Sequence, residues 1–264
     1  MSKFSDFENL ISIHNLLQIP EMKKTLIVIL FAMTIQVSSA QLKLVFTSKD
    51  GLKITADWYP VSSNFPVILL CHQAGYSRGE YSETALRLNK LGFNCLALDQ
   101  RSGDEINGIK NETAEEARIK KIVPSYADAE QDISAAVDYL FEKYKRPITI
   151  FGSSYSASLA LKIATESDKV ASVIVFSPGE YFEDKKYISS HIQTLTKPVF
   201  ATSSLAEADS VTDLLKDINS RVKIQYIPAS KGGHGAKVLW AESPSNHEYW
   251  IALMSFLNRI KTTE

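Results

Sequence analysis

The sequence predicts an α/β fold in which a mostly parallel sheet carries helices on both faces. Short apolar runs alternate with segments of helical periodicity through most of the chain, and this alternation implies right-handed crossovers between parallel strands. The runs are almost continuously apolar, so we expect strands that are buried on both sides. They comprise residues 67–71, 93–98, 148–151, 170–176, 199–202 and 222–227.

Two further β-rich runs, residues 41–47 and 52–59, precede these strands. They flank Ser48-Lys49-Asp50-Gly51, a turn sequence, and therefore predict an antiparallel hairpin that brings the sheet to eight strands. Helical patterns lie between the later strands and after the last one. The helices are predicted at residues 80–91, 125–144, 155–165, 207–218 and 245–260.

Residues 1–40 are predicted to be a leader and a secretory signal peptide, followed by one domain at residues 41–264. Met22-Lys23-Lys24 gives a positive start, residues 25–37 an apolar middle, and Ser38-Ser39-Ala40 a cleavage site. The simplest account of the preceding residues is translation from Met22. Because the apolar stretch is shorter than the roughly 20 residues that cross a bilayer, we expect export to the periplasm or the medium. An uncleaved membrane anchor at residues 25–40 is the alternative.

The composition argues against nucleic acid as a partner. The chain has 264 residues and a formal net charge of -1, and cleavage after Ala40 would leave 224 residues with the same charge, enough for a sizeable core. The basic group Arg118, Lys120 and Lys121 is expected on a solvated helix face. No grouping of His, Cys and carboxylates has metal-ligand spacing, so we predict no metal and no cofactor.

The two cysteines, Cys71 and Cys95, fall in strands that are expected to be neighbours. We interpret them as small buried thiols. A disulfide is the alternative for an exported protein, although the geometry of such a bond is demanding.

The strongest functional signal is the segment from Ile148 to Ala160. A β-branched run ends at Gly152, and small residues after Ser154 open a helix that packs closely on the sheet. A strand, a sharp turn and a helix with Ser154 at the apex lift its hydroxyl out of the backbone. Gly152 and Ser156 supply the small side chains that such a turn needs, and the positive end of the helix favours negative charge beside Ser154.

A second segment, Gly75-Tyr76-Ser77-Arg78-Gly79, fits the five-letter pattern of this turn more fully. The predicted strand before it ends near Cys71 and His72, so a loop separates that strand from the glycine. Because the turn requires the strand to run directly into its first glycine, we prefer Ser154 to Ser77 as the nucleophile.

The segment around Ser154 resembles the nucleophile elbow of the α/β-hydrolase superfamily, although Ser156 replaces the usual final glycine. The resemblance covers about residues 42–262 and is nearest to dienelactone-hydrolase-like esterases, with serine where those enzymes carry cysteine. It implies the α/β-hydrolase fold, with the elbow after the fifth of eight strands. It also implies a catalytic triad in the chain order serine, acid, histidine.

A serine hydroxyl needs a base to remove its proton. His234 lies in a glycine-rich loop after the last strand, which is where the superfamily places its base. His191 precedes the candidate acids, and His247 begins the last helix. We therefore predict that His234 is the base.

The acid is expected in the loop after strand 199–202. Members of the superfamily commonly carry Asp some nine residues after the proline that opens this strand, and Glu207 stands at that distance from Pro198. Glu207 is the first choice and Asp209 the alternative, because either has to accept a hydrogen bond from the imidazole. The other carboxylate is expected to favour the helix N-terminus.

Attack on an acyl carbonyl also requires N–H donors for the oxyanion. The resemblance assigns one donor to Tyr155, the residue after the nucleophile. It assigns the other to His72-Gln73-Ala74-Gly75, which is similar to the His-Gly motif of lipases and esterases, with Gln73 at the donor position. His72 is expected to be a structural residue, and Asp99 and Arg101 are expected to fix their loop.

Two insertions are expected to shape the substrate site. Residues 102–124 are polar and charged and are expected to form a small lid, whereas residues 178–196, with Tyr181, Phe182 and Tyr187, are expected to line one wall. Both are too short for a large cap domain, so an open site is predicted.

These features predict an exported serine hydrolase that cleaves the carboxylic esters of small-molecule acyl substrates through an acyl-enzyme. Amide or peptide hydrolysis on the same fold is one alternative. An inactive hydrolase scaffold that acts as a binding protein is another, because fold does not fix function. Membrane contact is expected only if the signal peptide stays uncleaved.

Overall fold

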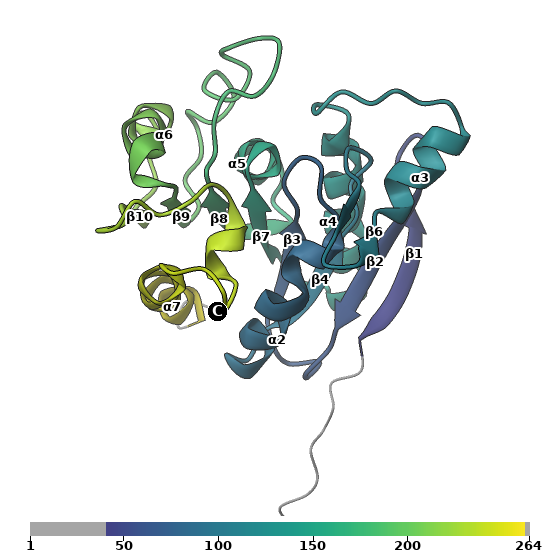
Figure 1. Ribbon diagram of the computed structural model, residues 1–264, viewed down its shortest axis with the longest axis horizontal. Coiled ribbons are helices and arrows are strands. Elements are labelled where there is room, and N and C mark those ends of the chain that lie inside the picture. The colour runs from purple at the N-terminus through teal and green to yellow at the C-terminus, as the bar shows by residue number, and fades with distance from the viewer. Residues whose placement is uncertain (1–40, 262–264) are drawn as a thin grey trace, which may run out of the picture. The chain divides into compact units, whose positions relative to one another are not determined.

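An eight-stranded sheet organises residues 41–261, which are the residues that the computed structural model describes. The predicted leader, signal peptide and cleavage site lie outside the described residues. The strand order is β1-β2-β4-β3-β7-β8-β9-β10 (Figure 1). β2 pairs antiparallel with both of its neighbours, and the remaining neighbours pair in parallel. The predicted mostly parallel sheet of eight strands is confirmed.

The strands begin and end within two residues of the predicted ranges. Those at the centre of the sheet, β3, β4 and β7, are buried along their whole length, as strands covered by helices on both faces must be. The strands are β1 Leu42–Thr47, β2 Lys53–Tyr59, β3 Val67–Cys71, β4 Asn94–Leu98, β7 Ile148–Ser153, β8 Val170–Phe176, β9 Val199–Thr202 and β10 Lys223–Tyr226.

Helices cover both faces of the sheet (Figure 1). One hydrophobic core packs α4, α5 and α6 on one face, and a second core packs α2 and α7 on the other. None of the helices in residues 41–261 is long and apolar enough to span a bilayer. The helices are α2 Ser82–Lys90, α3 Glu112–Ile119, α4 Ala129–Tyr144, α5 Tyr155–Glu166, α6 Ala208–Leu215 and α7 Asn246–Lys261, with short 3-10 helices η2 Arg78–Tyr81, η3 Leu205–Glu207 and η4 Ala236–Leu239.

The insertion at residues 102–124 differs from the expected lid. It forms a two-stranded hairpin, β5 Glu105–Ile106 and β6 Ile109–Lys110, followed by α3. The helix packs against β2, where the Thr113 hydroxyl oxygen accepts the Thr55 N–H at 2.9 Å. The first part of this insertion is therefore docked on the antiparallel side of the sheet.

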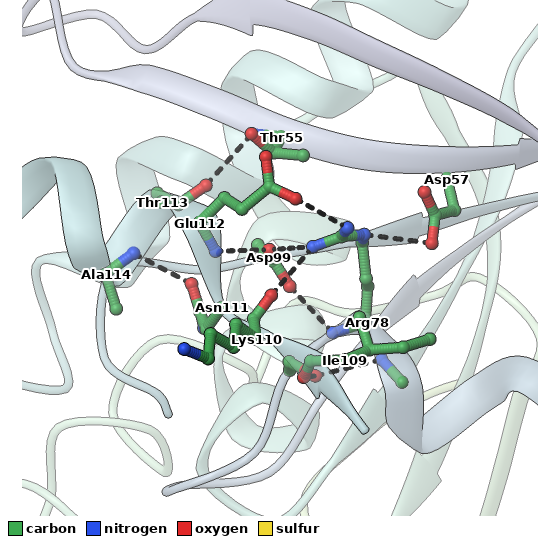
Figure 2. Close-up of polar contacts among 12 residues, drawn as sticks. Thr55, Asp57, Arg78, Asp99, Ile109, Lys110, Asn111, Glu112, Thr113 and Ala114 are labelled. Carbon is green, nitrogen blue, oxygen red and sulfur yellow. Dashed lines mark hydrogen bonds and ion pairs between the residues drawn. The ribbon is translucent and has the colours of Figure 1, made fainter. Parts of the chain in front are cut away.

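A buried arginine holds this docked insertion in place (Figure 2). The Arg78 guanidinium lies 2.9 Å from Asp57, 2.6 Å from Asp99 and 2.9 Å from Glu112. Asp57 and Asp99 are almost completely buried, and burial raises the pKa of both carboxyls, which Arg78 opposes. Arg78 thus joins β2, the end of β4 and the start of α3 through one charge network.

Cys71 and Cys95 are both buried and free. In the register of β3 and β4, Cys71 is opposite Leu98 and Cys95 is opposite Ile68, so the two thiols do not face each other. Burial raises the pKa of both thiols, which keeps them uncharged at neutral pH. They act as small apolar side chains in the core.

Candidate active site

Ser154 sits at the apex of a strained turn between β7 and α5. Its backbone has φ 59° and ψ -126°, in a region that residues other than glycine rarely occupy. A Cβ at Gly152 would lie 2.5 Å from the Cα of Ala157 and 2.6 Å from its N. Only glycine at position 152 lets α5 begin so close to the end of β7.

Ser156, which stands where the superfamily usually has glycine, ties this turn to the neighbouring strand. Its Oγ lies 2.8 Å from the carbonyl oxygens of both Cys71 and His72, at the end of β3, and it accepts the Ser153 N–H at 3.2 Å. The single hydroxyl proton is shared between these two buried carbonyl oxygens while the hydroxyl oxygen accepts the Ser153 N–H, so the serine adds hydrogen bonds that a glycine at this position would lack.

The side chains of Ser154, His234 and Glu207 form a continuous chain of contacts. His234 Nε2 lies 2.8 Å from Ser154 Oγ, and His234 Nδ1 lies 2.5 Å from Glu207 Oε1. Because an ionised carboxylate only accepts hydrogen bonds, Nδ1 carries the proton and Nε2 accepts from the serine hydroxyl. This arrangement can move the Ser154 proton to His234.

Glu207, and not Asp209, contacts the imidazole. Its second carboxylate oxygen accepts hydrogen bonds from the Ser204 hydroxyl at 2.8 Å and the Ser177 hydroxyl at 2.9 Å. Burial by itself would raise the pKa of Glu207, but hydrogen bonds from His234 and Ser204 lower it to about 2. Asp209 is exposed in the first turn of α6, where the helix dipole favours a negative charge.

Ser177 was not singled out from the sequence. It follows the end of β8 directly, has a φ of 53° and accepts the Gly235 N–H at 3.0 Å while it donates to Glu207. Ser177 therefore links the acid to the histidine loop. Its position at the carboxyl end of a predicted parallel strand is the one sequence signal that could have identified it.

Gly235 is required directly after His234. It has a φ of 73°, and a Cβ there would collide with Gln73 Oε1 and lie 2.7 Å from Ser153 Oγ. The glycine lets the histidine loop approach the residues on both sides of it, namely the elbow and the loop after β3.

The two predicted oxyanion donors have different surroundings. Tyr155 is the first residue of α5, so its N–H lies in the first helical turn, where no acceptor within the helix is available. The Gln73 N–H instead donates to Glu80 Oε2 at 2.7 Å. The structure contradicts the expectation that Gln73 presents this N–H to an oxyanion, because a buried carboxylate already binds it.

Glu80 connects the three loops of the site. One carboxylate oxygen binds the Gln73 N–H, the other accepts the Ser153 hydroxyl at 2.8 Å, and Ser153 Oγ accepts the Ala236 N–H at 2.8 Å. Glu80 is 1% exposed, and burial raises its pKa to about 7. The loop after β3, the elbow and the histidine loop are therefore held by one buried acid.

His72 is a buried structural residue, as expected. Its Nδ1 donates to the Gln73 carbonyl oxygen at 2.8 Å, and its Nε2 accepts the Gln100 N–H at 3.0 Å. Burial lowers the pKa of His72 to about 4, so the ring is neutral at physiological pH. Arg101 also has the expected loop-fixing contacts, to Asp132 at 2.6 Å and Asp50 at 2.7 Å.

The remaining candidates lie apart from these contacts. Ser77 is fully buried, accepts the Gly79 N–H at 3.1 Å and donates to the Ile109 carbonyl oxygen at 2.6 Å. It caps η2 and has no histidine within hydrogen-bond distance in the described part of the chain. His191 and His247 are exposed.

Known proteins share both the sequence pattern and the fold. Residues 62–241 match the family described as Serine aminopeptidase, S33. The fold is similar to an esterase from Pyrococcus furiosus, at 17% identity and a TM-score of 0.63 over 84% of this chain and 93% of that chain. It is also similar to a dienelactone hydrolase from Anabaena variabilis, at 16% identity and a TM-score of 0.63 over 82% of this chain and 95% of that chain.

A third similar structure is an acylaminoacyl peptidase from Pyrococcus horikoshii, at 16% identity and a TM-score of 0.61 over 87% of this chain and 43% of that chain. Among curated proteins, none matches this sequence. The family match spans more than half of the chain, and the structural neighbours share its layered sheet. The chain therefore belongs to the serine aminopeptidase S33 family of hydrolases, within the α/β-hydrolase superfamily.

Proposed function

We propose that this hydrolase cleaves carboxylic esters through an acyl-enzyme formed on Ser154. The observation that carries the proposal is the chain of contacts from Ser154 Oγ to His234 Nε2 at 2.8 Å and from His234 Nδ1 to Glu207 Oε1 at 2.5 Å. A hydroxyl, a base and an acid in this order are what nucleophilic attack by serine requires.

The reaction follows from these positions. His234 Nε2 takes the Ser154 proton as Oγ attacks the acyl carbon, and the imidazolium then protonates the departing alcohol as its bond to the acyl carbon breaks. Water attacks the acyl-enzyme, gives its proton to His234 and releases the acid, and Ser154 regains its proton. Glu207, whose pKa is lowered to about 2 after burial is offset by hydrogen bonds, stays ionised and stabilises the imidazolium.

The Tyr155 N–H at the start of α5 supplies one oxyanion donor in this proposal. For the second we propose the Ala74 N–H in place of the Gln73 N–H. Ala74 is the next residue of the same loop, and its N–H has no acceptor among residues 41–261, whereas Gln73 is bound to Glu80. Two such donors stabilise the negative charge that develops on the oxygen of the tetrahedral intermediate.

Labelling with a fluorophosphonate tests the nucleophile. The wild-type protein is expected to label and Ser154→Ala is not, whereas Ser77→Ala should label like the wild type. Labelling that persists in Ser154→Ala and disappears in Ser77→Ala would identify the other serine. A wild-type protein that does not label, although it is folded, would favour the inactive scaffold.

Amide hydrolysis is the second candidate, because the matching family is described as a serine aminopeptidase and one similar structure is an acylaminoacyl peptidase. The two candidates are separated by assaying 4-nitrophenyl esters of rising acyl length beside aminoacyl 4-nitroanilides. Turnover of the esters alone is expected. Turnover of the anilides alone would replace the ester proposal with the amide one.

We also propose that the protein is exported after cleavage behind Ala40. Support comes from the charged, apolar and small-residue segments between Met22 and Ala40. N-terminal sequencing of exported material should begin at Gln41. An uncut chain recovered from the membrane fraction would support the anchor at residues 25–40 instead.

A further inference from the structure

A pocket of about 470 Å³ lies between the segment before α4 and the insertion at residues 178–196. Four aromatic side chains line it: Tyr126, Tyr181, Phe182 and Tyr187. The Phe182 and Tyr187 rings pack against each other with centroids 4.9 Å apart, so two of the lining rings are in direct contact. The volume is typical of sites for small organic ligands.

Tyr181 connects the pocket to the triad. Its ring stands edge-on to the His234 ring, with centroids 6.4 Å apart and planes at 87°. Its hydroxyl donates to the Ser177 carbonyl oxygen at 2.8 Å. Burial raises the pKa of Tyr181 to about 12, so the hydroxyl stays protonated at neutral pH and can act as this donor.

Tyr126 connects the pocket to the elbow on the other side. Its ring stacks on the ring of Tyr155, with centroids 4.7 Å apart and planes at 22°. Tyr155 directly follows Ser154 and is itself buried. Two aromatic side chains of the pocket lining, from different segments, therefore pack against His234 and against the residue that follows Ser154.

We propose that this pocket is the acyl-binding subsite and that it takes an aromatic acyl group without a negative charge. The inference rests on the proposed serine hydrolase function. Tyr126 is 42% exposed and Tyr181 is 36% exposed, so both rings keep surface that an aromatic guest can cover. Stacked or edge-on contacts add to simple burial, and each is expected to change kcat/KM about three- to tenfold.

The charge of the lining argues against an anionic guest. Glu183 and Asp184 also line the pocket, and no lysine or arginine does so among the described residues. An acyl group with a terminal carboxylate would meet like charge without a compensating cation, which disfavours it. The pocket thus selects both for an aromatic ring and against a negative charge.

Four 4-nitrophenyl esters with one leaving group test the proposal. They are the butanoate, 3-cyclohexylpropanoate, 3-phenylpropanoate and 3-(4-carboxyphenyl)propanoate. We expect the highest kcat/KM for the phenyl ester, with the cyclohexyl ester at least threefold lower and the carboxyphenyl ester lower again. A cyclohexyl ester that reacts as fast as the phenyl ester, or a butanoate that reacts fastest, would overturn the aromatic assignment.

Substitutions of the lining residues test whether the preference for a phenyl group arises in this pocket. Tyr126→Leu and Phe182→Leu are each expected to lower the phenyl-to-butanoate ratio of kcat/KM about threefold or more. Phe65→Leu is the matched control, because Phe65 is 37% exposed and precedes β3, at the opposite end of that strand from the site. It should leave the ratio unchanged. A ratio that stays at the wild-type value in both pocket variants would place the acyl group elsewhere.

A competition experiment that requires no turnover tests the aromatic subsite separately from the serine hydrolase function on which it rests. 2-Phenylethylboronic acid should protect Ser154 from the fluorophosphonate at lower concentration than 2-cyclohexylethylboronic acid. Labelling with equal protection by both compounds would refute the aromatic subsite and leave the serine hydrolase intact. A folded protein without labelling would refute the hydrolase function and this inference with it.

Discussion

Ser154 and His234 are 80 residues apart in the sequence, yet Ser154 Oγ lies 2.8 Å from His234 Nε2. Ser154 follows β7 and His234 follows β10, and Glu207 follows β9 between them. The carboxyl ends of parallel strands meet at one edge of a sheet, where open α/β folds bind their ligands. The site therefore depends on three loops whose relative positions are fixed by the sheet, by Glu80 and by small residues at close approaches.

Replacement of each candidate acid by its amide should lower turnover by very different factors. Glu207→Gln is expected to lower kcat by about 10²- to 10⁴-fold, because an amide beside Nδ1 cannot stabilise the imidazolium. Asp209→Asn should stay within about twofold of the wild type, since Asp209 is exposed and surface substitutions have small effects. Steady-state kinetics on one ester measures both. A larger loss in Asp209→Asn would exclude Glu207 as the acid.

Gly152→Ala should destabilise the fold by about 2–3 kcal/mol through overpacking. The new Cβ would lie 2.5 Å from the Cα of Ala157, which cannot move without displacing α5. Gly108→Ala is the control, because Gly108 has a φ of 72° but nothing within 4 Å of the added carbon. Gly108→Ala should lower the free energy of unfolding by about 1 kcal/mol, which is the backbone strain of a side chain at this φ. Equal losses in equilibrium urea unfolding would show that the close approach at Gly152 is unimportant.

Removal of the Arg78 side-chain charge should lower the free energy of unfolding far more than removal of an exposed charge in the same network. Arg78→Met leaves Asp57 and Asp99 buried without a cation (Figure 2), which is expected to cost about 3–5 kcal/mol. Lys43→Met removes only the exposed ion pair with Glu112 and should cost less than about 1 kcal/mol. Similar unfolding midpoints for the two variants would contradict a structural role for the buried network.

The main sheet and five of the helices could be predicted because buried strands of parallel sheets are apolar and end where the pattern changes. Helix α3 was anticipated only as a solvated helix face for the basic group at residues 118–121, and its bounds were not predicted, because its stability does not come from an apolar stripe. Only Thr113, Ala114 and Ala117 of this helix are buried, while the Asn111 side chain caps its N-terminus and Glu112 binds Arg78. The contact with Arg78 depends on a residue far away in the sequence, so the periodicity of the segment does not reveal it.

The convergence of Ser154, Glu207 and His234 could also be anticipated, since loops after parallel strands share one edge. The assignment of the Gln73 N–H as an oxyanion donor, in contrast, did not match the structure. A motif gives the order of residues, but the direction of a peptide N–H depends on what is buried beside it. Here that is Glu80, which in the sequence is an ordinary polar residue at the start of a helix. Its burial follows only from the packing of η2 beneath the loop after β3.

Glu80 should make stability depend on pH in a direction opposite to that of a paired surface carboxylate. Burial raises its folded-state pKa to about 7 from an ordinary value of 4.5, although hydrogen bonds from the Gln73 N–H and the Ser153 hydroxyl oppose the rise. Between these two values the native protein holds a proton that the unfolded chain has released. The stability associated with Glu80 is therefore fully present below pH 4.5 and is lost as the pH rises through 7.

Glu80→Gln replaces this group with one that does not titrate but keeps an acceptor for the Gln73 N–H. The difference in free energy of unfolding between Glu80→Gln and the wild type should therefore rise between pH 4.5 and pH 7, by at most about 3 kcal/mol. Glu105→Gln, at an exposed position in β5, makes the same chemical change without the buried contacts and should lack this gain. Urea unfolding at several pH values measures both differences. If the Glu80→Gln difference were flat across that range, Glu80 would have to be ionised throughout, and the three loops would be held by a permanent carboxylate.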